Sequence, residues 1–70
     1  MQYVVITVVN REIYTEFYKT IEEARKSMMN TYKIYLESED LEEIDYNTDG
    51  KTSCWISGDD NVDIEIHEVI

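Results

Sequence analysis

The chain has 70 residues, of which 43% are hydrophobic, and its sixteen acidic and six basic side chains give a net charge of −10. This length predicts one small domain, residues 1–70, and the supply of β-branched and aromatic residues is sufficient for a core, which argues against disorder. The strong negative charge argues against direct binding to nucleic acid or to an anionic membrane, because both would repel it.

The chain contains a single cysteine, Cys54, so no internal disulfide can form. A lone thiol is typical of proteins in reducing compartments, and we expect a cytoplasmic location. The apolar opening lacks a basic start and is interrupted at Asn10 and Arg11, which is unlike a secretory leader. No apolar run approaches the roughly 20 residues that span a bilayer.

The first two predicted elements are strands that form a hairpin. Residues 2–9 are β-branched and aromatic, residues 12–18 alternate in character, and Asn10-Arg11 lies between them as the turn. If Val9 pairs with Glu12, five apolar side chains share one face, which we expect to pack in the core: Val4, Ile6, Val8, Ile13 and Phe17. Three tyrosines would then lie on the opposite face as a candidate dimer surface: Tyr3, Tyr14 and Tyr18.

An amphipathic helix is predicted over residues 21–37. Thr20 and Glu23 match a capping box, in which the Thr20 hydroxyl accepts a hydrogen bond from the Glu23 amide. Apolar side chains then recur at helical spacing: Ile21, Ala24, Met28, Tyr32, Tyr35 and Leu36. We expect this stripe to pack on the sheet.

The remaining chain predicts a short strand around residues 44–48, a strand over residues 52–57 and a last strand over residues 62–69. Asp49-Gly50 and residues 58–61 are the predicted turns. The expected fold class is therefore α+β, a two-layer domain with one helix on an antiparallel sheet, in the order ββαββ or ββαβββ. The order of the strands within the sheet does not follow from these patterns.

The pairing of the last two strands determines which side chains share a sheet face with Asp63 and Glu65. If Ser57 pairs with Val62, Trp55 faces the core. Five side chains then share the opposite face: Cys54, Ile56, Asp63, Glu65 and His67. Because Cys54 and His67 lie diagonally and no third orienting group or oxyanion site accompanies them, we expect no catalytic dyad and no enzyme.

Residues 45–53 resemble the first half of an EF-hand or dockerin-type calcium loop. Asp45, Asn47 and Asp49 place oxygen ligands at alternate positions, Gly50 follows at the sharp turn, and Ser53 occupies a further ligand position. The resemblance stops there, since Ile56 stands where such loops carry a bidentate acid. The same residues are typical of an Asp-Gly hairpin turn, which we favour over a cation-binding module.

Charge is divided unevenly along the chain. Residues 1–36 carry four acids and five bases, or +1, and residues 37–70 carry twelve acids and one base, or −11, which sum to −10. Alternate residues on a strand, such as Asp63 and Glu65, lie about 6.6–6.8 Å apart, and regularly spaced carboxylates can stand in for phosphates. Eight residues form the expected partner-binding surface: Glu37, Glu39, Asp40, Glu42, Glu43, Asp45, Asp63 and Glu65.

In composition and size, though in no sequence motif, the chain is similar to DNA-mimic inhibitors, which include anti-CRISPR and other phage-encoded anti-defence proteins. We therefore expect a non-enzymatic inhibitor or regulator that needs no cofactor and binds the basic surface of a nucleic-acid-binding protein. Two alternatives stay open: a cation-binding module at Asp45, Asn47 and Asp49, and a ligand-free oligomerising domain that pairs through its tyrosines.

Overall fold

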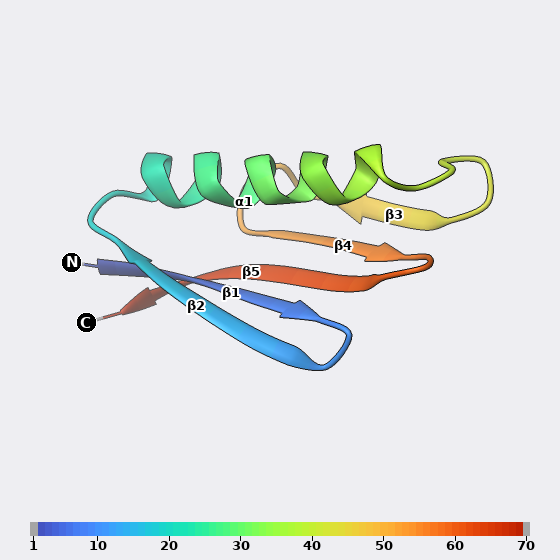
Figure 1. Ribbon diagram of the computed structural model, residues 1–70. Helices are drawn as coiled ribbons and strands as arrows, with labels where there is room; N and C mark the ends of the chain where they lie inside the picture. Colours follow the sequence, from blue (N-terminus) through green and yellow to red (C-terminus); the bar gives the residue numbers. More distant parts are fainter. Residues whose placement is uncertain (1, 70) are drawn as a thin grey trace.

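The computed structural model describes residues 2–69, which form five strands and one helix (Figure 1). The elements are β1 (Gln2–Val9), β2 (Glu12–Tyr18), α1 (Ile21–Glu37), β3 (Asp45–Thr48), β4 (Ser53–Ser57) and β5 (Asn61–Val69). Neighbouring strands are antiparallel in the order β2-β1-β5-β4-β3, so β5 is the central strand. The predicted α+β class is confirmed, with the order ββαβββ.

Local sequence signals account for the ends of the first elements. Asn10 and Arg11 form the turn between β1 and β2 with φ values of 50° and 75°, the left-handed backbone of a two-residue hairpin turn. The predicted pairing of Val9 with Glu12 is confirmed. Thr20 caps α1, because its hydroxyl accepts from the Glu23 N–H over 3.2 Å, and the helix has the predicted bounds.

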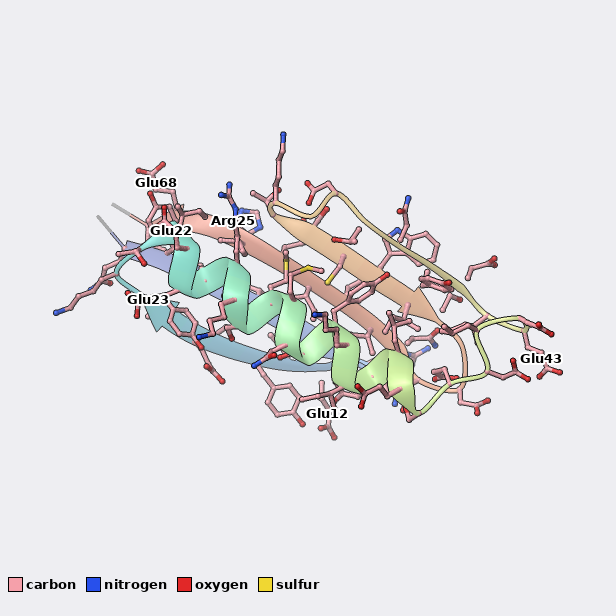
Figure 2. All side chains as sticks on the ribbon, turned by 90° about the horizontal axis from the view of Figure 1, so that it is seen from above. Glu12, Glu22, Glu23, Arg25, Glu43 and Glu68 are labelled. Carbon is pink, nitrogen blue, oxygen red and sulfur yellow. The ribbon has the colours of Figure 1, made fainter. Side chains whose placement is uncertain are left out.

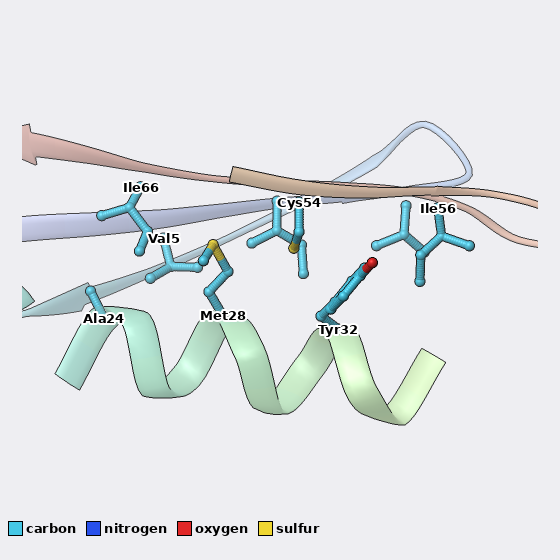
Figure 3. Close-up of a cluster of buried hydrophobic side chains, with 9 residues drawn as sticks. Val5, Ala24, Met28, Tyr32, Cys54, Ile56 and Ile66 are labelled. Atoms are coloured by element: carbon cyan, nitrogen blue, oxygen red, sulfur yellow. The ribbon is translucent and has the colours of Figure 1, made fainter. Parts of the chain in front are cut away.

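The core lies between α1 and one face of the sheet (Figure 3). Its buried residues come from the helix and from three strands: Val5, Ala24, Met28, Tyr32, Cys54, Ile56, Val62, Ile64 and Ile66. The predicted apolar stripe of α1 is thereby confirmed. Within residues 2–69, no helix is long and apolar enough to cross a membrane.

The first hairpin packs on the helix with the opposite face from the one we predicted. Val5 is buried and lies level with Ile66 across the β1–β5 pairing, whereas Ile13 and Phe17 remain 68% and 60% exposed. The prediction that the Ile13 and Phe17 face packs in the core is therefore wrong, although Val4 of the predicted set is buried, at 8% exposure, between Phe17 and His67 of the neighbouring strands. Strand β1 is apolar on both faces, so its own pattern cannot select one, and its pairing with the strictly alternating β5 decides.

The β4–β5 hairpin is also displaced by one residue from the predicted register. Ser57 pairs with Asn61 rather than with Val62, so the connection is residues 58–60. A slip of one residue exchanges the two faces of a strand. Cys54 and Ile56 therefore enter the core, and Trp55 lies on the other face, where it is 39% exposed.

Candidate functional site

No described element covers the sheet face that points away from α1 (Figure 1). We call this surface the open face. Residues that pair across neighbouring strands point to the same side of a sheet, and alternate residues share a face, which assigns the side chains. The open face consists of Gln2, Val4, Ile6 and Val8 of β1, Ile13, Thr15 and Phe17 of β2, Asn61, Asp63, Glu65, His67 and Val69 of β5, Ser53, Trp55 and Ser57 of β4, and Asp45 and Asn47 of β3.

The β1–β2 side of the open face is apolar. Val4 pairs with Phe17, and Val8 pairs with Ile13, so valines alternate with larger side chains across the two strands. The outer strand β2 has no neighbour beyond it in the sheet, and Ile13 and Phe17 are consequently the most exposed part of this surface. Large apolar side chains exposed together on one face are typical of an interaction surface.

The carboxylates of Asp63 and Glu65 lie in the middle of the open face, because β5 is the central strand. Asp63 is level with Val8 on one side and with Trp55 on the other. The open face therefore places negative charge directly beside apolar side chains. No Lys or Arg belongs to the residues that we assign to this face.

A second group of acids gathers at one end of the molecule. The α1–β3 connection and the β4–β5 turn lie at the same end (Figure 1), and Glu43 lies at the opposite end from Glu22 and Glu68 (Figure 2). We call this group the acidic tip: Glu37, Glu39, Asp40, Glu42, Glu43, Asp59 and Asp60. The two aspartates of the turn were not among the predicted partner-binding residues, because only the fold brings the turn beside the connection.

Two carboxylates of the acidic tip form hydrogen bonds with backbone N–H groups of its loops. Glu39 accepts hydrogen bonds from the backbone N–H groups of Asp59 and Asp60 at 3.3 and 3.1 Å, and Asp40 accepts from the Glu42 N–H at 3.1 Å. Gly58 allows this close packing, since a Cβ there would come within 3.0 Å of the Glu39 carboxylate. Glu39 and Asp40 thus hold the loops, whereas the exposed Glu42 side chain is available to a partner.

The negative charge of both surfaces is not neutralised within the part of the chain that the structure describes. Among residues 2–69, no Lys or Arg forms an ion pair with a carboxylate within 4 Å, and the one carboxylate contact with a basic side chain at that distance joins Glu65 Oε1 to the imidazole Nε2 of His67 at 3.9 Å. Arg25 instead donates from Nε to the Lys51 carbonyl at 3.0 Å. The eight predicted partner-binding residues therefore have no Lys or Arg within ion-pair distance, and they form two groups, one at the acidic tip and one on the open face.

Asp49 organises the β3–β4 turn. Its Oδ1 accepts from the backbone N–H groups of residues 51–53 at 2.7, 2.8 and 3.0 Å, and these bonds hold the pKa of Asp49 well below its usual range. Asp45 and Asn47 belong to β3 and pair with β4, which confirms the predicted hairpin. Among residues 2–69, no three His, Cys, Asp or Glu side chains cluster closely enough to hold a metal ion.

The expectation that Cys54 and His67 share a face is wrong. Cys54 points into the core and His67 lies on the open face, because the β4–β5 register differs from the predicted one. Burial, followed by the negative charges of Asp49 and Asp63, raises the pKa of the Cys54 thiol to about 12. The thiol is therefore protonated at neutral pH and is not an activated nucleophile.

The three tyrosines lie on the helix side of the sheet, so the expectation that they lie opposite the core is also wrong. Tyr3 and Tyr18 pack against the core cluster. The Tyr18 hydroxyl donates to the Glu16 carboxylate and lies 2.9 Å from Ser27 Oγ, and the bond to Glu16 raises the Tyr18 pKa. Tyr14 alone remains largely exposed, so these residues do not form one continuous patch.

Comparison of the chain with protein-family models, with curated proteins and with solved structures finds no significant match. The fold and the two surfaces therefore provide the evidence for function. Sequence reasoning found most of the carboxylates of both surfaces, but it missed Asp59 and Asp60, and it assigned Ile13, Phe17 and Trp55 to the core. The one available signal for Trp55 was its position between Ser53 and Ser57, two polar residues that share its face.

Proposed function

We propose that the protein is a non-enzymatic interaction domain that binds the basic surface of a nucleic-acid-binding protein and inhibits or regulates it by occupying the site of DNA or RNA. One observation carries this proposal. Among residues 2–69, the carboxylates of the acidic tip and the open face have no Lys or Arg partner within 4 Å.

Uncompensated charge of this kind favours a cationic partner. A net charge of −10 on 70 residues opposes folding through self-repulsion, and that repulsion is relieved when a basic surface binds. The same field accelerates the encounter with a basic protein and makes binding sensitive to salt. A surface whose acids were paired with its own lysines would have neither property.

The geometry of the carboxylates supports competition with nucleic acid. Asp63 and Glu65 are held about 6.6–6.8 Å apart on the central strand, where hydrogen bonds on both sides make the backbone rigid. The molecule measures 39 × 22 × 15 Å, so its long axis covers about eleven base pairs of duplex at 3.4 Å each. Negative charge is thus carried on a body long enough to fill a cationic nucleic-acid site.

Three double variants with equal charge test the proposal. Glu42→Lys/Glu43→Lys alters the tip, Asp63→Lys/Glu65→Lys alters the open face, and Glu22→Lys/Glu68→Lys is the control at the opposite end of the molecule. Each variant changes the net charge by +4, from −10 to −6. Each would be immobilised and used to capture proteins from a nuclease-treated lysate.

We expect the parent chain and the control to capture the same basic protein, and we expect the tip and open-face variants to lose it. Capture should weaken steeply between about 50 and 200 mM salt, and added duplex DNA or RNA should compete. In a mobility-shift assay, adding the chain should also displace the captured protein from the nucleic acid that it binds. Equal capture by all three variants, or capture that nucleic acid does not displace, would contradict the proposal.

A further inference from the structure

A purely ionic partner would leave the apolar side of the open face in water. Ile13 is 68% exposed, Phe17 is 60% exposed and Trp55 is 39% exposed, and all three lie on the same side of the sheet. Two of them belong to β2 and one to β4, so they flank the carboxylates of β5. The surface therefore combines apolar contact area with a row of negative charge.

We propose that the open face is the binding site of a basic amphipathic helix of the partner protein. The helix lies along β1, with its apolar side on Ile6, Val8, Ile13 and Phe17, and with Lys or Arg side chains against Asp63 and Glu65. The inference rests on the proposed function and specifies which structural element of the nucleic-acid-binding protein is recognised.

The dimensions of the sheet fit one helix. Neighbouring strands lie about 4.7–4.9 Å apart, so β2 and β5, on either side of β1, are separated by about 9.6 Å. A helix is about 10–12 Å wide with its side chains, and it therefore contacts all three strands at once. The eight residues of β1 extend about 26 Å, which is the length of about 17 helical residues.

The chain already uses this arrangement on its other face. Helix α1 has 17 residues and packs its apolar stripe on the opposite side of the same sheet (Figure 1). A second helix on the open face would complete a three-layer arrangement with helices on both sides of the sheet. The open face differs from the covered face in having carboxylates along its central strand, which is why the second helix must be basic.

Charge complementarity selects this occupant over two others. A second copy of the chain would bring a net charge of −10 against −10 and would place the Asp63 and Glu65 rows close to each other. An uncharged apolar helix would desolvate the same carboxylates without pairing them, which is costly. A Lys or Arg flank pairs both, and the Trp55 ring beside Asp63 adds a surface on which a guanidinium can stack.

Fluorescence anisotropy with the full chain and a defined peptide tests this inference. The probe is a labelled peptide of about 18 Leu and Lys residues, with Leu at helical spacing so that one side is apolar. A peptide of the same composition in scrambled order is its control. Ile13→Thr/Phe17→Thr removes apolar area without changing the charge, and both sites are exposed, so the fold should persist. Circular dichroism verifies folding of each variant.

We expect the amphipathic peptide to bind at least about tenfold more tightly than the scrambled one. Ile13→Thr/Phe17→Thr and Asp63→Lys/Glu65→Lys should each weaken binding of the amphipathic peptide at least about tenfold. Glu42→Lys/Glu43→Lys changes the net charge as much as Asp63→Lys/Glu65→Lys does, but it should weaken binding of this peptide by less than about threefold. Equal affinity for both peptides, or equal loss in the two charge variants, would overturn the inference. The inference would also be overturned if light scattering shows that the parent chain is a dimer and that Ile13→Thr/Phe17→Thr is a monomer, since a second copy would then cover the open face.

Failure of this inference can be distinguished from failure of the proposed function. If Ile13→Thr/Phe17→Thr binds the amphipathic peptide as tightly as the parent, while Asp63→Lys/Glu65→Lys still loses capture from the lysate, only the docked helix is refuted. If the peptide results are as expected but nucleic acid does not displace the captured protein, only the proposed mimicry is refuted.

Discussion

Replacing Phe17 by Thr tests which face of the sheet is the core. Phe17 is 60% exposed, so about two-fifths of its side chain is buried. Full burial of a large apolar side chain contributes roughly 1.5–3 kcal/mol, and the expected loss at this position is therefore about 1 kcal/mol. Met28 is fully buried, so Met28→Ala loses the transfer free energy and leaves a cavity, at a cost of about 2–5 kcal/mol.

Urea unfolding followed by circular dichroism measures both variants. The free energy of unfolding for a chain of this length is roughly 3.5–10 kcal/mol. The loss of about 1 kcal/mol expected for Phe17→Thr is therefore measurable, whereas the larger loss expected for Met28→Ala brings that variant close to unfolding. Partial unfolding of Met28→Ala without urea would also agree with the expected large loss of stability. If Phe17→Thr costs as much as Met28→Ala, the Phe17 side of the first hairpin is packed, and the open face is not available to a partner.

Four further predictions concern single residues. Cys54 should react with Ellman's reagent only as the chain unfolds, because burial raises its pKa to about 12, and rapid labelling of the folded chain would contradict its place in the core. Because the pKa of Asp49 is lowered in the folded chain, its contribution to stability is present above its unfolded pKa of about 3.9 and is lost as the pH falls further. The urea midpoint of Asp49→Asn should therefore fall less steeply than that of the parent chain between about pH 5 and 2. Glu39→Ala should lower the free energy of unfolding by about 1–2 kcal/mol through the loss of two backbone bonds, and Glu39→Gln should cost less, so an unchanged midpoint in the Ala variant would refute its role in the tip. Arg11→Gly should raise the free energy of unfolding by about 1 kcal/mol, because Arg11 has a φ of 75°, and a loss of stability would show that this backbone conformation carries no cost.

The two surfaces differ in how far the sequence predicts them. The carboxylates of the acidic tip are mostly contiguous in the chain, so their density is visible without a structure. Asp63 and Glu65 alternate with buried residues, and their shared face follows from strand geometry alone. Their neighbours were not predicted, because Val8 reaches Asp63 through the pairing of β1 with the distant β5, and Trp55 reaches it through a β4–β5 register displaced by one residue from the predicted one.

The sequence by itself determined the elements whose signals act over a few residues. The Asn10-Arg11 turn, the Thr20 cap and the helical spacing of Met28 and Tyr32 specify a hairpin and a helix locally, and both form as predicted. Only the tertiary structure decided which face of that hairpin the helix covers. Strand β1 offers apolar side chains on both faces, and the choice is made by its pairing with β5, whose buried and exposed residues alternate without exception from Val62 to His67.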